Sequence, residues 1–273
     1  MEVSFTSVHA FGLERSLEVL NEGFSDYIVP IHLEIDRFRD MARADSVDFE
    51  LSQVLVTRGE AAGVALIARR GNLCRLAAMS VRPEFRGGGN GRKLLDQLLK
   101  DARARRDSRM MLEVIESNEA AVRLYESAGF KAKRRLLSFG LDEGEGNGGE
   151  LGSASFGEIA DVVDSDGLED LPWQASAETA AQFRAPSVAV RLGDAYAAIS
   201  NPVAPKTAIQ CLIVRQESRG QGQASRLMLS LFQKYPGRRW LVPAICPAEL
   251  GGFFEKLDFS TGELSQLQMS IEL

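Results

Sequence analysis

VRPEFRGGGNGRKLLDQLL, residues 81–99, has a near-copy later in the chain, VRQESRGQGQASRLMLSLF, residues 214–232. Eight of the nineteen aligned positions are identical, and the paired arginines Arg86 and Arg219 are 133 residues apart. A spacing of that size is the length of a domain and is far longer than the unit of a solenoid repeat. The repeat therefore predicts that the chain of 273 residues holds two domains of the same kind.

Composition predicts where these two domains meet. The segment DEGEGNGGELGS, residues 142–153, combines five glycines with four acidic residues, and such a segment cannot build a core. We therefore expect an N-terminal domain over residues 1–141, a linker over residues 142–153 and a C-terminal domain over residues 154–273.

Hydropathy patterns predict the same order of elements in both domains. In the first, a strand and two helices precede a hairpin and a third strand. The glycine loop then leads into an amphipathic helix with Leu94, Leu95 and Leu98 on one stripe. A strand, a short helix and a closing strand follow, and the second domain repeats the series with a shorter front. The predicted fold class is α/β, with a mixed, mostly antiparallel sheet flanked by helices in each domain.

Composition and charge argue against several classes of protein. Residues 1–142 carry 22 Lys and Arg against 21 Asp and Glu, and residues 143–273 carry 10 against 17, whereas a general nucleic-acid binder needs a net basic face. The longest run without a polar residue, residues 61–68, is too short to span a bilayer. Three cysteines without a CxxC pair, and no signal peptide, favour a cytoplasmic protein. No spacing of His, Cys and carboxylates indicates a metal site.

The repeated loop has the chemistry of an anion site. A strand that runs into glycines and then into a helix leaves backbone N–H groups free at the helix start, where the helix dipole is positive, so a phosphate or pyrophosphate can bind. An ordinary glycine-rich turn that caps a core helix has the same local pattern. Two common phosphate motifs fit poorly, because Lys93 is followed by Leu94 instead of a hydroxyl residue, and the glycines do not follow G-x-G-x-x-G.

The spacing Arg86-x-x-Gly89-x-Gly91 resembles the R/Q-x-x-G-x-G/A loop of the GNAT superfamily of N-acetyltransferases. The segment LEVIESNEAAVRLYESAGF, residues 112–130, is similar to the strand and helix that follow this loop in that family. In order of elements the resemblance covers most of residues 1–141, and the second copy of the loop fits the same pattern. The resemblance implies two tandem GNAT domains and the use of acetyl-CoA, with no metal.

The resemblance also implies which residues bind acetyl-CoA. The loop amides would hold its pyrophosphate, the strand before the loop would pair with its pantetheine arm, and an Asn in the later helix would contact that arm. The implied residues are Met79, Ser80, Val81, Arg86, Gly87, Gly88, Gly89, Asn90, Gly91, Arg92 and Asn118 in the first copy, and Arg219, Gly220, Gly222 and Ala224 in the second.

Acetyl transfer to an amine also needs a proton for the departing thiolate and a neutral amine. Tyr125 matches the family's Tyr in the helix after the strand and is the candidate acid, although a half-buried core aromatic would look the same. Glu113 resembles in position the glutamate that ribosomal-protein alanine acetyltransferases use as a base through water, but it could equally form a cross-strand charge pair. Asp26 and Tyr27 are either acceptor-pocket residues or turn residues.

The second copy lacks parts of this machinery. The two copies are aligned by counting back from Gly129-Phe130 in the first and from Asp258-Phe259 in the second. Phe254 then aligns with Tyr125, and Pro247 aligns with Asn118. We therefore expect the N-terminal domain to move an acetyl group from acetyl-CoA by direct attack to a primary amine, on a small molecule or a peptide N-terminus. The alternative is a non-catalytic acyl-CoA-binding or sensing module. The chain would be either a monomer with pseudo-dimeric domains or a homodimer, without nucleic-acid or membrane partners.

Overall fold

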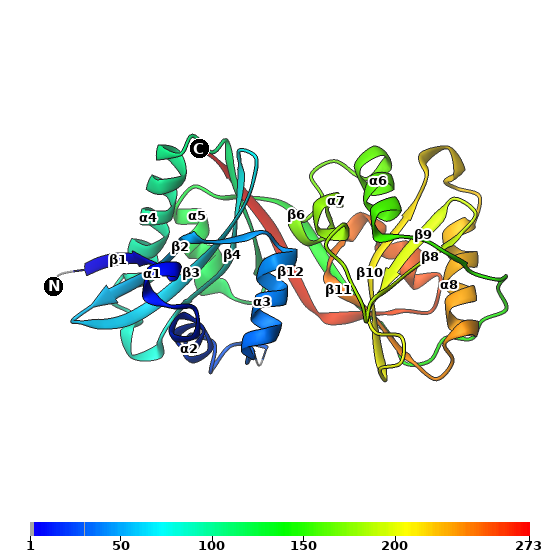
Figure 1. Ribbon diagram of the computed structural model, residues 1–273, viewed down its shortest axis with the longest axis horizontal. Helices are drawn as coiled ribbons and strands as arrows, with labels where there is room; N and C mark the ends of the chain where they lie inside the picture. The colour runs from blue at the N-terminus through cyan, green and yellow to red at the C-terminus, as the bar shows by residue number, and fades with distance from the viewer. Residues whose placement is uncertain (1–2, 30) are drawn as a thin grey trace. The chain divides into compact units, whose positions relative to one another are not determined.

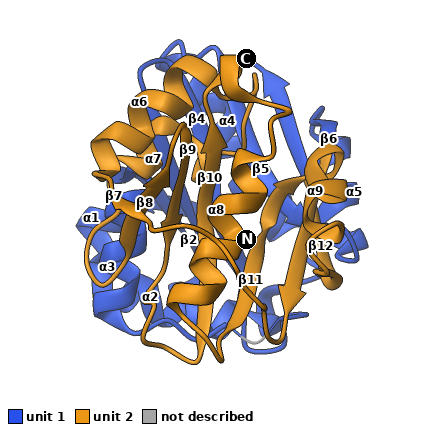
Figure 2. Cartoon of the chain, turned by 90° about the vertical axis from the view of Figure 1, so that its right-hand side faces the viewer, with its two compact units in different colours: residues 1–133, 268–273 blue, residues 134–267 orange. Residues whose placement is uncertain are grey.

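The computed structural model describes residues 3–29 and 31–273, and tertiary contacts divide the chain into two compact units (Figure 2). Unit 1 contains Met1–Lys133 and Gln268–Leu273, and unit 2 contains Arg134–Leu267. The division differs from the one expected from composition. It falls inside the strand β6 (Lys131–Leu141), and the last six residues of the chain return to unit 1. Composition shows where a chain cannot build a core. It does not show a boundary that falls inside a strand, where the first residues of the strand belong to one unit and the remaining residues belong to the other.

Unit 1 is built on a mixed sheet in the order β1-β2-β3-β4-β5-β12 (Figure 1). Neighbouring strands from β1 to β4 are antiparallel, and β4 and β5 are parallel. The strands are β1 Val3–Ser7, β2 Val47–Thr57, β3 Glu60–Arg70, β4 Leu73–Val81, β5 Arg109–Ile115 and the end of β12 Ser260–Glu272. The expected mixed, mostly antiparallel sheet is therefore confirmed.

Helices cover both faces of this sheet, because consecutive residues of β3 from Ala62 to Ala68 are all buried and neighbouring side chains in a strand point to opposite faces. Leu20 of α2 and Phe38 of α3 pack with Val64 and Leu66 of β3 in one core. The leucine stripe of α4 is buried as well. The helices are α1 Val8–Phe11, α2 Leu13–Gly23, α3 Ile35–Ala44, α4 Asn90–Ala104 and α5 Glu119–Ser127, with a 3-10 turn, η1, at Pro83–Phe85.

Unit 2 repeats this plan around a sheet in the order β6-β11-β10-β9-β8-β7. Trp240 and Phe139 are buried at its centre, where α8 packs on the sheet. Its strands are β7 Gly152–Ser153, β8 Val188–Leu192, β9 Ala195–Ile199, β10 Lys206–Val214 and β11 Arg239–Pro247. Its helices are α6 Phe156–Asp166, α7 Ala177–Ala180, α8 Gln223–Lys234 and α9 Gly251–Glu255, with 3-10 turns η2 Trp173–Ala175, η3 Gln216–Ser218 and η4 Ala248–Leu250. Among the described residues, no helix is both long and apolar enough to cross a membrane.

Each unit contains two parallel strands that separate after a short paired stretch. In unit 1, β4 and β5 pair only at Leu73–Arg75 with Arg109–Met111, and in unit 2, β10 and β11 pair only at Lys206–Ala208 with Arg239–Leu241. The register also skips one residue at the same place in both units, Ala77 in β4 and Gln210 in β10. A bulge bends its strand, so the two strands splay and leave backbone groups of β4 and β10 free to pair with a ligand.

The glycine-rich segment, residues 142–153, has a structural role that its composition did not predict. It lies within unit 2, and its glycines alternate with exposed residues as it runs along α8. A Cβ atom on Gly144 would overlap the ring of Phe232, and one on Gly146 would overlap the carbonyl oxygen of Leu229. The segment is therefore a strap against α8, and glycine is required where the strap and the helix backbone are in contact.

Replacing Gly146 by alanine is expected to destabilise unit 2 by about 1–3 kcal/mol, the usual effect of forcing an extra carbon into a packed site. Trp240 is fully buried in that unit, so its fluorescence during denaturant unfolding reports the loss. Gly149→Ala is the matched control, because its Cβ would lie at an ordinary 3.7 Å from Leu192 Cδ1. Equal midpoints for the two variants would show that the strap does not press on α8.

Candidate active site

The glycine loop of unit 1 has a backbone that only glycine adopts easily. Gly87 and Gly89 have φ values of +76° and +74°, in the left-handed region. Gly89 is the N-cap of α4, and no side chain caps the helix there. The N–H groups of the first turn are thus left for a ligand, at the positive end of the helix dipole. Of the two interpretations of the sequence, an anion site is the one this geometry favours.

Unit 2 repeats the loop almost without change. Gly220 and Gly222 have φ values of +75° and +73°, and α8 also begins without a side-chain cap. One of the differences, Ala224 in place of Gly91, has a simple explanation. A Cβ on Gly91 would make only an ordinary contact of 3.6 Å with Leu124 Cδ2, so either residue fits.

The arginine of the loop holds the loop in place. Arg86 Nε donates to the carbonyl oxygen of Val81 at 2.9 Å, and its terminal nitrogens bond Gly23 O at 2.8 Å and both carboxylate oxygens of Asp26 at 2.7 and 2.8 Å. Arg219 likewise donates to Val214 O and to the carbonyl oxygen of the last residue of α6. The sequence suggested that Arg86 adds charge at the phosphates, but its hydrogen bonds pin the loop to the end of α2.

Asp26 is therefore better explained as the partner of Arg86 than as an acceptor-binding residue. The hydrogen bond from Arg86 lowers the pKa of Asp26, so the pair stays charged at neutral pH. Nothing in the local sequence indicated this bond, because the two residues are sixty positions apart.

The strand before the loop has the geometry expected for holding an extended ligand. Met79 and Val81 are half-buried on the free stretch of β4, whereas Ser80 is buried and its hydroxyl donates to Leu20 O at 3.4 Å. A Cβ on Gly23 would overlap the Ser80 side chain, so α2 lies directly against this strand. The backbone of residues 79–81, more than the Ser80 side chain, is available to a ligand.

Tyr125 is buried, with 7% of its surface exposed, and its ring packs against Phe130 with centroids 5.8 Å apart. Burial raises its pKa well above the ordinary value, and the nearby Tyr27 raises it further. The phenol is therefore fully protonated at neutral pH, as a proton donor must be. The structure thus brings together Tyr125 and Tyr27, which the sequence had proposed separately as acid and acceptor-pocket residue.

Three of the other predicted residues organise the ends of helices. Asn118 is the N-cap of α5, and its side-chain oxygen accepts from Ala121 N at 3.2 Å. Asn90 donates to Phe85 O at 2.9 Å and closes the loop, while Arg92 bonds both Asp96 and Ser127 and so ties α4 to α5. A Cβ on Gly88, in contrast, would make only an ordinary contact, 3.9 Å from Asn90 Nδ2.

A model of the acetyltransferase (GNAT) family matches residues 17–130, which span the loop, both splayed strands and α5. Residues 17–130 form a GNAT acetyltransferase domain. The protein is thus an acyltransferase, and enzymes of this family generally take the acetyl group from acetyl-CoA. The loop amides and the free stretch of β4 fit the pyrophosphate and the arm of such a donor.

Solved structures have the same fold over both units. A putative acetyltransferase from Pyrococcus horikoshii is 13% identical with a TM-score of 0.68, and the match covers 99% of this chain and 89% of that one. A GCN5-related N-acetyltransferase from Sphaerobacter thermophilus is 15% identical with a TM-score of 0.68, covering 99% and 95%. A tandem GNAT protein from the clavulanic acid biosynthesis pathway is 13% identical with a TM-score of 0.66, covering 99% and 98%. These identities establish the fold alone, which is a tandem GNAT fold. A comparison with curated proteins finds no match.

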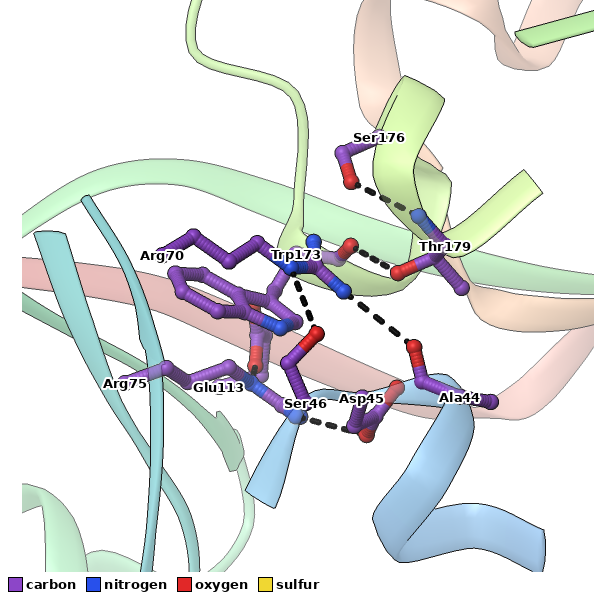
Figure 3. A network of polar contacts seen from close by, with 9 residues as sticks. All are labelled: Ala44, Asp45, Ser46, Arg70, Arg75, Glu113, Trp173, Ser176 and Thr179. Atoms are coloured by element: carbon purple, nitrogen blue, oxygen red, sulfur yellow. Dashed lines mark hydrogen bonds and ion pairs between the residues drawn. The ribbon is translucent and has the colours of Figure 1, made fainter. Parts of the chain in front are cut away.

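Within the GNAT domain, Glu113 forms the charge pair that was one of its two interpretations. Arg75 Nε donates to Glu113 Oε2 at 2.7 Å, and Arg75 Nη1 donates to Asp45 Oδ2 at 2.8 Å (Figure 3). Burial acts to lower the pKa of Arg75, but Glu113 and Asp45 outweigh it, and the pKa is raised. A carboxylate that neutralises a buried guanidinium is poorly suited to take a proton from an amine. The sequence analysis does not identify Arg75 or Asp45. The available signal for Arg75 is that it is the one charged residue within the apolar run LCRLAAMSV.

Unit 2 has no phenol at the position of Tyr125. Phe254 is buried there and stacks on Phe139, with ring centroids 5.4 Å apart. The strand ends at Pro247, which caps the 3-10 turn η4 through its backbone only. In the described part of the chain, no group of three or more His, Cys, Asp or Glu residues is placed to hold a metal ion.

Proposed function

We propose that the N-terminal unit transfers an acetyl group from acetyl-CoA to a primary amine, and that Tyr125 returns a proton to the departing thiolate. The observation that carries this proposal is a buried phenol on α5, kept protonated, in the unit whose strands β4 and β5 splay beside an uncapped glycine loop. The phenol can hydrogen-bond the sulfur and donate its proton to it as negative charge develops there during the breaking of the carbon–sulfur bond.

The reaction balances without a metal or a covalent enzyme intermediate. The nitrogen of a neutral amine bonds the carbonyl carbon, the carbon–sulfur bond breaks, and the amine loses one proton to solvent. The thiolate gains one proton from Tyr125, which solvent reprotonates. The products are an amide and free coenzyme A. Because Glu113 is held by Arg75, we propose that the acceptor arrives already neutral and needs no carboxylate base.

The acceptor is a primary amine on a small molecule or a peptide N-terminus, and Tyr27 is its proposed contact beside Tyr125. The alternative function, a module that binds acyl-CoA without turnover, predicts saturable binding and no amide product with any amine.

The test uses the full chain, acetyl-CoA and a panel of diamines, amino-acid amides and short peptides. Release of free thiol and the mass of the acetylated amine are the readouts. Gly89→Asp places a negative charge in the glycine loop of unit 1, and Gly89→Asn is the neutral control. Asp and Asn are chosen because their side chains tolerate the left-handed backbone better than others do. Loss of charge-assisted hydrogen bonds should lower kcat/KM about 10- to 100-fold in the Asp variant.

Gly222→Asp, the same change in unit 2, should leave turnover intact. The opposite pattern, in which only Gly222→Asp abolishes turnover, would assign the chemistry to unit 2. Binding of acetyl-CoA with no amide product from any amine would favour the alternative module.

A further inference from the structure

The guanidinium of Arg86 joins three segments of unit 1. Its Nε donates to Val81 O at the end of β4, and one terminal nitrogen donates to Gly23 O at the end of α2. Its two terminal nitrogens also donate to the carboxylate of Asp26, in the turn after α2, at 2.7 and 2.8 Å. A planar guanidinium that bonds both oxygens of a carboxylate fixes the orientation of the two groups as well as their distance.

The same side chain belongs to the glycine loop. Arg86 directly precedes Gly87, the first left-handed glycine of the loop. A guanidinium has five N–H donors, and the hydrogen bonds to Val81, Gly23 and Asp26 use four of them. One donor is thus left for an anion at the loop, while the other four hold the loop and the turn after α2 together.

The turn that contains Asp26 also contains Tyr27. Phe24 N donates to Leu20 O and Tyr27 N donates to Phe24 O, both at 3.1 Å, so the turn closes on the end of α2. The rings of Phe24 and Tyr27 pack with centroids 4.9 Å apart. Tyr27 lies near enough to Tyr125 to raise its pKa. Because Tyr27 directly follows Asp26, the position of the carboxylate sets the position of this phenol.

The ion pair of Arg86 and Asp26 is exposed to solvent. The side chains are 41% and 57% exposed, and ion pairs of this kind contribute little to the stability of a fold. The helix before the turn is held instead by its apolar face, where Leu17 and Leu20 are buried in the core. The pair therefore fixes the positions of the loop and the turn more than it stabilises unit 1.

The equivalent arginine of unit 2 hydrogen-bonds no carboxylate among the described residues. Arg219 donates to the carbonyl oxygens of Val214 and of Asp166, the last residue of α6. Unit 2 nevertheless has a cavity of about 620 Å³ between β10 and β11, and Arg219 lines it. The arginine of the loop is thus common to both units, whereas its carboxylate partner is present in unit 1, the unit that also has the phenol of Tyr125.

We propose that Asp26 is a positioning residue for acetyl transfer. Through Arg86 it holds the turn of residues 24–27 against the glycine loop, so that one guanidinium fixes both the loop that receives the donor and the acceptor contact Tyr27. Asp26 itself touches neither substrate. A donor bound at the loop then restricts the turn as well. The inference rests on the proposed function for the role of Tyr27, but the coupling of loop and turn is measured without turnover.

The test is hydrogen exchange of the full chain, read by mass spectrometry, with coenzyme A as the probe. In the unsubstituted chain, coenzyme A should slow exchange in peptides from residues 82–95 and also in peptides from residues 20–29. In Asp26→Asn, whose amide nitrogen cannot accept from Arg86, the peptides of residues 82–95 should stay protected and those of residues 20–29 should lose protection. Asp26→Glu, which keeps the carboxylate, should recover part of it.

Glu14→Gln is the matched control. Arg39 donates to Glu14 Oε1 at 2.9 Å, and this exposed pair lies at the opposite end of α2 from Asp26. Glu14→Gln should keep the protection of both sets of peptides. Both neutral variants should have the unfolding midpoint of the unsubstituted chain by circular dichroism, since neither removes a buried group.

Kinetics give a second readout once an amine is found that the chain acetylates. Asp26→Asn should raise KM for that amine at least about fivefold, the lower end of typical coupling between two sites. The dissociation constant of coenzyme A should stay nearly unchanged, because Val81 and Gly23 still hold Arg86. A merely structural role would not separate the two constants in this way.

Equal protection of residues 20–29 in Asp26→Asn and in the unsubstituted chain would overturn the proposal, and so would the same loss in Glu14→Gln. No protection of residues 82–95 in the unsubstituted chain would overturn the donor site as well as the coupling. Coupled protection in a chain that acetylates no amine would support the positioning role of Asp26 and count against the proposed function, so the two failures are distinguished.

Discussion

Replacing Tyr125 by phenylalanine is expected to lower kcat about 10²- to 10³-fold and to leave the dissociation constant of acetyl-CoA unchanged. The ring keeps its packing against Phe130, so only the hydroxyl is lost. If the phenol protonates the thiolate, its removal raises the barrier for the breaking of the carbon–sulfur bond without touching the loop that holds the donor. The measurement combines steady-state kinetics at saturating amine with calorimetric titration of acetyl-CoA.

Tyr235→Phe is the control for this variant. This substitution also removes a phenolic hydroxyl. Tyr235, however, lies at the end of α8 in unit 2 and is not among the residues that line the cavity between β10 and β11. It should have the kinetics of the unsubstituted chain. Equal kcat values for Tyr125→Phe and the unsubstituted chain would reduce Tyr125 to a packing residue and favour the non-catalytic module.

The pH profile gives an independent readout of the same role. Burial raises the pKa of Tyr125 above its ordinary value, so the donor stays protonated as pH rises to that value and beyond. The acceptor amine, in contrast, becomes more reactive as it loses its proton. We therefore expect kcat/KM to rise with pH up to about 9.5 without a descending limb from the tyrosine.

Replacing Arg75 by methionine is expected to lower the free energy of unfolding of unit 1 by about 3–5 kcal/mol. Arg75 is 4% exposed and neutralises two carboxylates, one of which, Glu113, has a side chain only 1% exposed. Methionine fills much of the space, but it leaves Glu113 as a buried carboxylate without its guanidinium and removes one ion pair of the half-buried Asp45. The free energy of unfolding of Arg75→Lys should lie between those of the unsubstituted chain and Arg75→Met. A lysine keeps the positive charge, but its ammonium group cannot reproduce the planar guanidinium that bonds two carboxylates.

Both tryptophans of the chain, Trp173 and Trp240, belong to unit 2, so their fluorescence is not a direct probe of the core of unit 1. Hydrogen exchange of β3 and β4 amides is the suitable measurement. The matched control is the triple variant Arg75→Met, Glu113→Gln and Asp45→Asn, which removes all three charges and should recover much of the loss. If it is as unstable as Arg75→Met, the effect comes from packing and not from unpaired charge.

The features predicted correctly from the sequence are those set by neighbours in the chain. Gly87 and Gly89 were identified from their spacing because a left-handed backbone between a strand and a helix is a local requirement that glycine meets. The same spacing at Gly220 and Gly222 produced the same φ values. The mixed sheet followed from hydropathy periods of two and 3.6 residues, which depend on only a few consecutive positions.

The roles of charged residues could not be predicted in the same way. Arg86 is expected at the phosphates from the sequence, but its partner Asp26 lies in the turn after α2. The sequence does not decide between a base and a charge pair for Glu113, because its partner, Arg75, is 38 residues away and faces it only through the register of β4 and β5. A one-residue shift in that register would turn the two side chains to opposite faces.

Local sequence was thus sufficient for the glycine loops, the repeated fold and the loss of the phenol in the second copy, because each depends on residue identity and short-range backbone conformation. The strap of residues 142–153 on α8, the buried partners of Arg75 and the cavity of unit 2 depend on packing between segments far apart in the chain. Glycine-rich composition suits a flexible linker and a tightly packed strap equally well. Only the surface that the folded chain brings against it distinguishes the two.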